Sequence, residues 1–231
     1  MARTDMKMRR SILHMRTTAI ICLSASTAIC CAQYSVLPGE TDLDGCFPKT
    51  PARICLGAGG ASHCYSSPSD KDYIFGLEPR AKAVGMLNGK QLTLFTAMFS
   101  GCGSGTLTKF ALLTTSNGEF VNLLPKVELT NQSEYRFWSV PAISSLPVLA
   151  TADFVWDYKA MNASNYSKET HLAFHRYSIQ AFIFDTKSGR YVQKAGYETT
   201  RKYPGLDDVD EIKVLEAEKG AILAKLMRRP G

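Results

Sequence analysis

The sequence lacks the short motifs that would identify a catalysed reaction. Residues 56–61 (LGAGGA) are rich in glycine, but no Gly-Lys-Ser/Thr ending follows them, which argues against a phosphate-binding loop. Residues 101–105 (GCGSG) place Cys102 where the G-x-S-x-G nucleophile motif requires a glycine. These absences argue against two large classes of enzyme, the P-loop nucleotide hydrolases and the α/β-hydrolases.

The chain also lacks a strong excess of charge once its first 32 residues are set aside. It contains 27 Lys and Arg against 21 Asp and Glu, and residues 1–32 hold five of the bases and one of the acids. The remainder therefore has 22 basic and 20 acidic residues, a net charge of +2. Because nucleic-acid binding depends on a concentrated basic surface, we expect no nucleic-acid partner.

The apolar run near the start is too short to span a membrane. Residues 17–31 form an uncharged, largely apolar stretch of 15 residues, whereas a membrane-spanning helix needs about 20. Basic residues precede this stretch and Ala32 follows it, which is typical of a secretory signal peptide over residues 1–32. We therefore expect a secreted or periplasmic protein with no membrane span after leader removal. The alternative is an uncleaved N-terminal anchor.

Few cysteines remain beyond this leader. They are Cys46, Cys55, Cys64 and Cys102. An even number in an exported chain predicts two disulfides, and of the three possible pairings we favour Cys46–Cys55 with Cys64–Cys102. The spacings of nine, nine and 38 positions argue against a zinc site. Residues 33–72, rich in Gly, Pro, Ser and Asp, are expected to be irregular and pinned by these disulfides.

Residues 73–231 are predicted to form a single β-rich domain. Alternation is clearest over residues 177–184 (YSIQAFIF), and turn residues 185–189 (DTKSG) and a second extended run follow, which predicts a β-hairpin. Further strand signals recur about every 10 to 15 residues. The predicted fold is mainly β (α+β): a twisted antiparallel sheet of about six to nine strands with one C-terminal helix. The alternative is a degenerate β-propeller-like arrangement.

The C-terminal helix is predicted at about residues 208–228. Its apolar positions recur with a spacing near 3.6 residues, and Asp207 or Asp208 is expected to cap its start. Docking of this apolar stripe on the sheet is the expected arrangement, and binding of a partner is the alternative. The stripe consists of Ile212, Leu215, Ile222, Leu223 and Leu226.

One polar group could bind a metal. Asp153 and Asp157 would share one face of a strand, as would His171 and His175. If the two segments pair across the loop at residues 159–168, carboxylates and imidazoles converge, a mixture that suits a divalent metal. No other cofactor is expected. A solvated sheet face with hydrogen-bonded histidines is the plainer interpretation.

Aromatic residues in the same region could form a binding face. Trp156, Tyr158 and Tyr177 would stack on a carbohydrate or contact a protein partner, although core packing is the plainer and favoured account of such residues. The sequence therefore favours an exported, non-enzymatic binding or structural module whose ligand it does not identify. The alternative is a small exported hydrolase that uses Asp157 with His171 or His175, with a metal as a potential aid.

Overall fold

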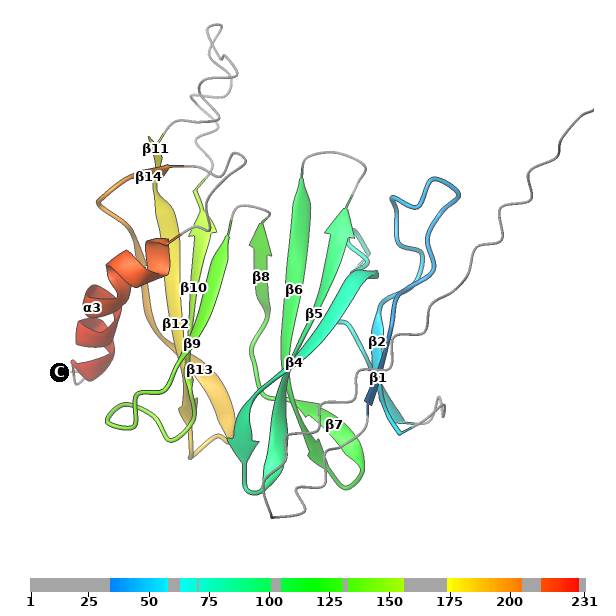
Figure 1. Ribbon diagram of the computed structural model, residues 1–231, viewed down its shortest axis with the longest axis horizontal. Coiled ribbons are helices and arrows are strands. Elements are labelled where there is room, and N and C mark those ends of the chain that lie inside the picture. The colour runs from blue at the N-terminus through cyan, green and yellow to red at the C-terminus, as the bar shows by residue number, and fades with distance from the viewer. Residues whose placement is uncertain are drawn as a thin grey trace, which may run out of the picture.

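The computed structural model describes residues 34–57, 63–69, 71–100, 105–130, 133–155, 174–204 and 213–228. Within these ranges the chain is mainly β, with one α-helix at its C-terminal end (Figure 1). The strands form three antiparallel sheets and one additional ladder of two residues per strand. The mainly β class and the C-terminal helix are thus confirmed.

The three sheets follow one another along the chain. The first contains β1 (Tyr34–Leu37), β2 (Arg53–Leu56) and β3 (Cys64–Ser66). The second contains β4 (Leu77–Leu87), β5 (Lys90–Ser100), β6 (Thr106–Ser116), β7 (Glu119–Asn122) and β8 (Val127–Thr130). The third contains β9 (Glu134–Trp138), β10 (Val148–Phe154), β12 (Tyr177–Asp185) and β13 (Arg190–Glu198), in the order β13-β12-β10-β9. The short ladder joins β11 (Phe174–His175) to β14 (Tyr203–Pro204).

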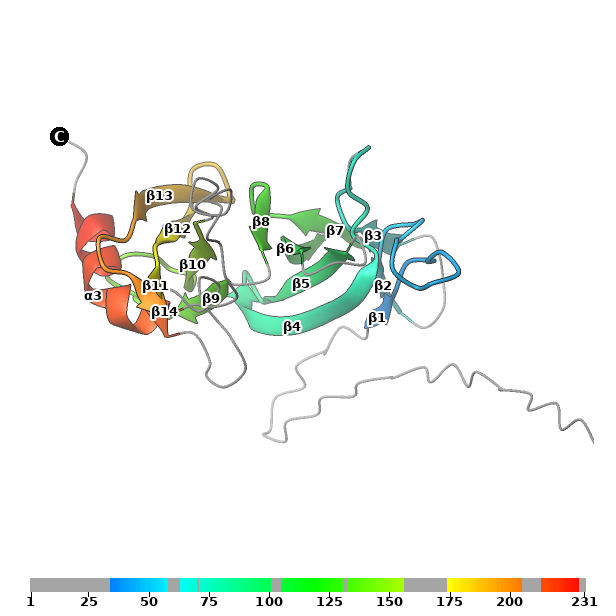
Figure 2. The same ribbon diagram turned by 90° about the horizontal axis from the view of Figure 1, so that it is seen from above.

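The sheets are stacked, and helix α3 (Val214–Met227) covers the outer face of the third sheet (Figure 2). Each gap between layers holds its own apolar core. The helix-side core includes Trp138, Phe154, Tyr177, Leu215 and Ile222. The central core, between the second and third sheets, includes Leu92, Phe110, Leu112, Leu149 and Phe182. The N-terminal core, between the first and second sheets, includes Ile54, Phe75, Phe95, Ala111 and Leu113.

Alternation along the strands explains why the expected single sheet is wrong. On β6, Phe110 and Leu112 belong to the central core, whereas Ala111 and Leu113 face the N-terminal core. A sheet with two apolar faces must be covered on both sides, so the chain builds stacked layers instead of one extended sheet. The described strands form no propeller, so that alternative is not supported.

The segment expected to be irregular contains the whole first sheet. β2 pairs with β1 and with β3, and the second pairing places Cys55 opposite Cys64. These two cysteines form a disulfide with a Cα–Cα distance of 4.0 Å. The favoured pairing of Cys46–Cys55 with Cys64–Cys102 is therefore wrong, because strand register brings Cys55 and Cys64 together. Cys46 is also disulfide-bonded, and Cys102 lies outside the described residues.

Helix α3 begins later than predicted and is capped from a distant strand. Its N-cap is Lys213, which makes no side-chain capping bond, and residues 205–212 lie outside the described ranges. The β9 residue Glu134 replaces the cap: its Oε2 accepts a hydrogen bond from the backbone N–H of Leu215 at 2.9 Å. In the part of the chain that the structure describes, no helix has the length and apolar character needed to cross a membrane.

The predicted hairpin at residues 177–193 is present as β12 and β13. Asp185 begins the turn, and its carboxylate accepts hydrogen bonds from the backbone N–H groups of Lys187 and Ser188 and from the Ser188 hydroxyl. Gly189 ends the turn with a φ of 65°, which glycine adopts without steric cost. These bonds lower the pKa of Asp185, with the Ser188 hydroxyl making the largest contribution.

Candidate ligand-binding site

Two strands, β7 and β8, pair with different parts of the same edge of β6, and the strand pairing is interrupted between them. β7 pairs with β6 residues 113–116, and β8 pairs with residues 107–110. Pro125 lies in the connection and cannot donate a ladder hydrogen bond. The side chain of Asn122 bridges the gap, because its Oδ1 accepts hydrogen bonds from the backbone N–H groups of Leu112 and Leu124, both at 3.0 Å.

A cavity of about 290 Å³ opens at this interruption. Its apolar lining consists of Pro68, Phe110 and Pro125. Its polar lining consists of Ser69, Lys109, Asn122 and Lys126. Small-molecule sites are commonly concave, mostly apolar and equipped with a few polar groups, with volumes of about 300–1,000 Å³. This cavity is therefore at the small end of that range.

Lys109 is the most unusual side chain at the cavity, because lysine is almost never fully buried unless it is paired. Its side chain is 5% exposed. Strand register places Lys109 directly opposite Glu128 on β8, and the two side chains form an ion pair. The Lys109 Nζ also lies 4.9 Å from the ring centre of Phe75, which is fully buried in the N-terminal core.

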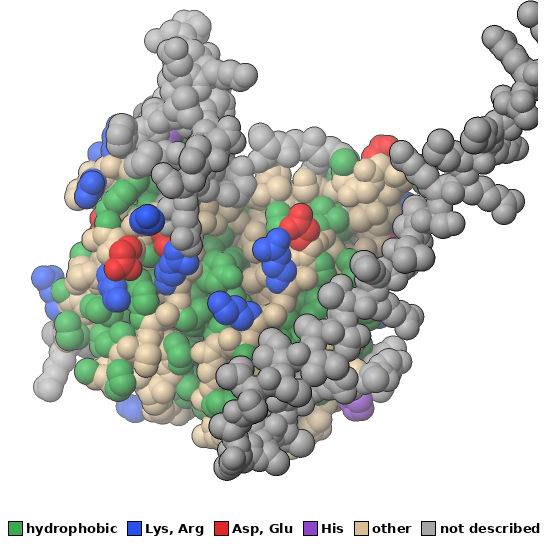
Figure 3. All heavy atoms as spheres, viewed as in Figure 1, with side chains coloured by type: hydrophobic (Ala, Val, Ile, Leu, Met, Phe, Trp, Pro, Cys, Tyr) green, Lys and Arg blue, Asp and Glu red, His purple; other side chains and the backbone are tan. Residues whose placement is uncertain are grey.

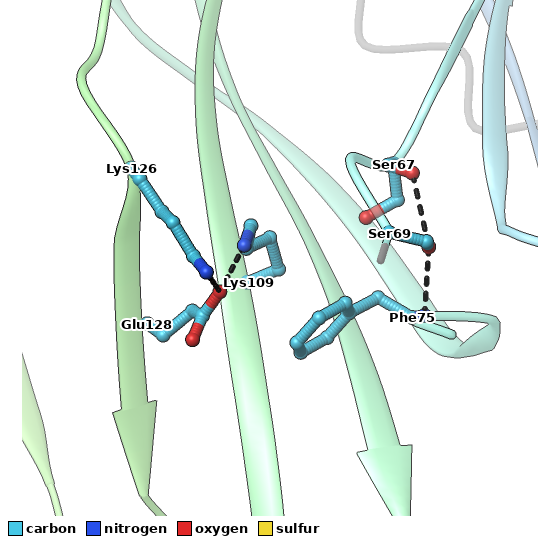
Figure 4. A network of polar contacts seen from close by, with 6 residues as sticks. All are labelled: Ser67, Ser69, Phe75, Lys109, Lys126 and Glu128. Atoms are coloured by element: carbon cyan, nitrogen blue, oxygen red, sulfur yellow. Dashed lines mark hydrogen bonds and ion pairs between the residues drawn. The ribbon is translucent and has the colours of Figure 1, made fainter. Parts of the chain in front are cut away.

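A second lysine contacts the same carboxylate oxygen. Lys126 Nζ lies 3.1 Å from Glu128 Oε1, the atom that also pairs with Lys109. Figure 4 shows the two lysine side chains converging on Glu128 from β6 and from the segment just before β8. Two ammonium groups and one carboxylate leave this group of side chains with a net charge of +1. The Lys126 side chain is 65% exposed, so it connects the buried pair to solvent.

Ser69 and Phe75 form the wall on the other side of Lys109 (Figure 4). The Ser69 hydroxyl donates a hydrogen bond to the backbone carbonyl of Ser67 at 3.3 Å and accepts one from the backbone N–H of Phe75 at 3.1 Å. These bonds lie within the connection between β3 and β4 and fix its local conformation. Of this segment, Pro68 and Ser69 line the cavity.

The structure does not bring the predicted metal ligands Asp153 and His175 together. The Oδ1 atom of Asp153 accepts hydrogen bonds from the Thr130 hydroxyl at 2.7 Å and from the Thr130 N–H at 3.0 Å. The ring of His175 lies 4.2 Å from the ring of Phe154, which faces the helix-side core. Because Asp153 and Phe154 are neighbours on a strand, their side chains point to opposite faces of the sheet.

The other predicted metal ligands, Asp157 and His171, lie outside the described residues. The strands on either side of residues 159–168 do pair as expected, with Phe154 opposite Tyr177 and the backbone N–H of Val155 donating to the Arg176 carbonyl. Among the described residues, no three His, Cys, Asp or Glu side chains are grouped so that they could hold a metal ion. Metal binding that includes Asp157 and His171 stays a prediction.

Of the three predicted aromatic binding residues, the structure describes one. Tyr177 is fully buried in the helix-side core, where its ring meets Phe154 and Tyr203 edge to face. It therefore packs the core instead of presenting an aromatic face to a ligand. Burial raises the pKa of Tyr177 to about 12, with smaller contributions from the negative charges of Glu134 and Asp153. Trp156 and Tyr158 lie outside the described residues.

Two further polar clusters hold α3 against the third sheet. Tyr197 and Tyr203 each donate a hydrogen bond from the phenol to the carboxylate of Glu218 on the helix. Glu134, which is 7% exposed, caps the helix through Leu215 and also pairs with Arg136 at 3.0 Å. Both clusters account for the position of the helix.

The outer surface offers no concentrated charge on the side shown in Figure 3. Basic and acidic side chains are interspersed there with apolar ones, without a continuous basic stripe. This distribution agrees with the near-neutral charge of residues 33–231.

The extended run at residues 106–115 forms most of β6, but an alternating strand pattern alone does not reveal the importance of Lys109. Residues 106–115 (TLTKFALLTT) contain a single charged residue in an otherwise apolar and hydroxyl-bearing run. A lone lysine on a strand with apolar neighbours on both faces indicates a buried charge. Because charges are rarely buried without a partner, it also indicates that an acidic side chain lies nearby in the fold. Its partner Glu128 is 19 positions away and was identifiable only through the strand register.

Comparison with known proteins yields no relationship from which a function could be transferred. No protein-family model, no curated protein and no solved structure matches this chain.

Proposed function

We propose that the protein is an exported, non-enzymatic binding module that takes a small ligand into the cavity beside Lys109. The observation that carries this proposal is the buried Lys109 ammonium in the cavity wall. The Lys109 side chain is only 5% exposed, and burying its charge costs free energy. A fixed partner or a bound ligand of opposite charge offsets that cost.

Hydrogen-bond capacity supports this assignment. An ammonium group has three donors, and Glu128 is the one acceptor that Lys109 contacts among the described residues. Buried donors in proteins are generally satisfied. Acceptor atoms of a bound molecule, placed in the adjoining cavity, would complete the hydrogen bonding of Lys109.

The cavity volume favours a small molecule over a polymer. At about 290 Å³ it is close to the lower limit for small-molecule sites, and its lining combines three apolar residues with a few polar groups. Export rests on the predicted leader at residues 1–32, and the Cys55–Cys64 disulfide is compatible with an oxidising compartment. The alternative hydrolase with Asp157 and His171 or His175 involves residues beyond the described ranges, apart from His175.

Ligand-observed NMR on residues 33–231 tests the proposal. A library of small anionic, neutral and cationic compounds is screened against the wild type and against Ser69→Leu, which places a larger apolar side chain in the cavity wall. Ser188→Leu is the matched control, because Ser188 also makes local hydrogen bonds but lies in the β12–β13 turn.

We expect compounds that bind the wild type and Ser188→Leu but not Ser69→Leu. Thermal melting of each variant verifies that it is folded. If no compound of any charge class binds the wild type, the binding-module proposal is wrong.

A further inference from the structure

We infer that Asn88 and Asn117 are sites of spontaneous covalent modification, at which water converts the side-chain amide to a carboxylate. Each is followed by glycine, and no other asparagine in the chain is. Both asparagines are exposed in the turns of two hairpins, β4–β5 and β6–β7. The inference is independent of the proposed ligand.

The chemistry is an intramolecular substitution followed by hydrolysis. The backbone nitrogen of the glycine loses its proton to hydroxide and attacks the Cγ atom of the preceding asparagine. The new C–N bond closes a succinimide ring, and the side-chain nitrogen leaves as ammonia after taking a proton from water. A water molecule then opens the ring at either carbonyl, which gives aspartate or isoaspartate with no change in oxidation state.

Both turns are accessible to this reaction. Glycine has no side chain that could obstruct the attacking nitrogen. Apart from chain neighbours, no atom lies within 4 Å of the position that a Cβ would occupy at Gly89 or Gly118, so both turns are open to water. Within the part of the chain that the structure describes, the side chains of Asn88 and Asn117 make no hydrogen bond that would hold the amide in place.

Asn122 provides a contrast within the same chain. It precedes Leu123, whose side chain is buried. Its Oδ1 accepts hydrogen bonds from the backbone N–H groups of Leu112 and Leu124. A bulky following residue and a fixed amide both oppose ring closure, so Asn122 should not react.

The folded turns slow the reaction without preventing it. The φ angle is 51° at Asn88 and 75° at Gly89, and it is 52° at Asn117 and 80° at Gly118. Two residues with positive φ between directly paired strand ends form a type I′ turn. In that conformation the glycine nitrogen lies on the far side of the asparagine Cα–C bond from Cβ, away from Cγ. Attack therefore requires the turn to open, and its rate depends on the free energy of local opening.

Modification at Asn117 should weaken the pairing of β7. Isoaspartate carries the chain through the side-chain carbon, so it lengthens a turn whose two-residue length fixes the register of the flanking strands. The pairs that hold β7 to β6 run from Ser116 and Glu119 to Leu113 and Asn122. Asn122 also lines the cavity, so this modification acts next to the candidate site.

Peptide mapping by mass spectrometry during incubation at neutral pH tests the inference. The intact protein is incubated in native buffer and in guanidinium chloride, both prepared in water labelled with heavy oxygen. We expect labelled oxygen at Asn88 and Asn117 and none at Asn122. Both reactions should be at least about tenfold slower in the folded protein, equivalent to an opening free energy of at least about 1.4 kcal/mol. A peptide of residues 114–120 is the control for the solvent and should react equally fast in both.

Two variants complete the test. Asn117→Gly removes the amide and keeps a residue that tolerates positive φ, so it should abolish modification in that turn and leave the reaction at Asn88 unchanged. Asn117→Asp supplies the charge of the product without the longer backbone, and the isoaspartate form, separated by chromatography, should melt at a lower temperature than this variant. Absence of modification in guanidinium chloride overturns the two sites. Equal rates in both solvents overturn protection by the turns, and equal melting temperatures overturn the effect on β7.

Discussion

Glu128→Gln should destabilise the protein far more than Lys109→Met, although both changes break the same ion pair. The glutamine variant leaves an ammonium group that is 5% exposed without its partner carboxylate, Glu128. Breaking a buried pair in this way costs about 3–5 kcal/mol. In a domain of this size each kcal/mol lowers the melting temperature by about 2–4 °C, so the expected decrease is roughly 6–20 °C.

Removing the other partner of the pair, in Lys109→Met, should destabilise the protein only mildly. In Lys109→Met the remaining carboxylate is 25% exposed and still pairs with Lys126 at 3.1 Å, while methionine replaces the aliphatic part of the lysine. Its cost should be about 1 kcal/mol or less. The double variant Lys109→Met/Glu128→Gln should recover most of the loss seen in Glu128→Gln, which gives a coupling energy of at least about 2 kcal/mol.

Urea unfolding measured by tryptophan fluorescence provides the free energies, since Trp138 is buried beneath α3. Glu78→Gln is the matched control, because its pair with Arg80 is 61% and 79% exposed and should contribute less than about 1 kcal/mol. The reasoning is refuted if Glu128→Gln costs no more than Lys109→Met or no more than the control.

Three other predictions follow from the described contacts. Tyr177→Phe should stabilise the protein by about 1 kcal/mol in urea unfolding, because the Tyr177 hydroxyl is buried without a hydrogen-bond partner among the described residues. Tyr203→Phe should instead destabilise the protein by about 1–3 kcal/mol, because it loses the hydrogen bond to Glu218. A destabilised Tyr177→Phe variant would contradict this account. Because burial raises the folded-state pKa of Tyr177 from 10.0 to about 12, the folded protein keeps a proton that the unfolded chain releases, so this contribution to stability is complete below pH 10 and is lost as the pH rises toward 12. Tyrosinate absorbance with parallel melting curves measures that loss, and a stability independent of pH over this range would disprove it. With Cys55 bonded to Cys64, the other two cysteines of residues 33–231, Cys46 and Cys102, should form the second disulfide, which non-reducing peptide mapping detects; a free thiol at Cys102 would refute it.

The sequence by itself determined the local structure of the β12–β13 hairpin and of the C-terminal helix. Alternation at residues 177–184 and the Asp185-to-Gly189 turn specify a hairpin through the conformational preferences of neighbouring residues, and that hairpin is present. The spacing of Leu215, Ile222 and Leu226 likewise specifies a helix that buries one side. These features depend on residues within a few positions of one another, so they can be read without knowledge of the fold.

Only the tertiary structure decided which strands pair, how the sheets stack and where charges meet. The Cys55–Cys64 disulfide, the Glu134 cap on Leu215 and the Lys109–Glu128 pair all follow from register or packing between separate elements. Period-2 alternation identifies a strand's two faces but not what covers them, and both faces of β6 are apolar. The cavity beside Lys109 arises where two strands share one edge of β6, a consequence of long-range pairing to which no local pattern in the sequence corresponds.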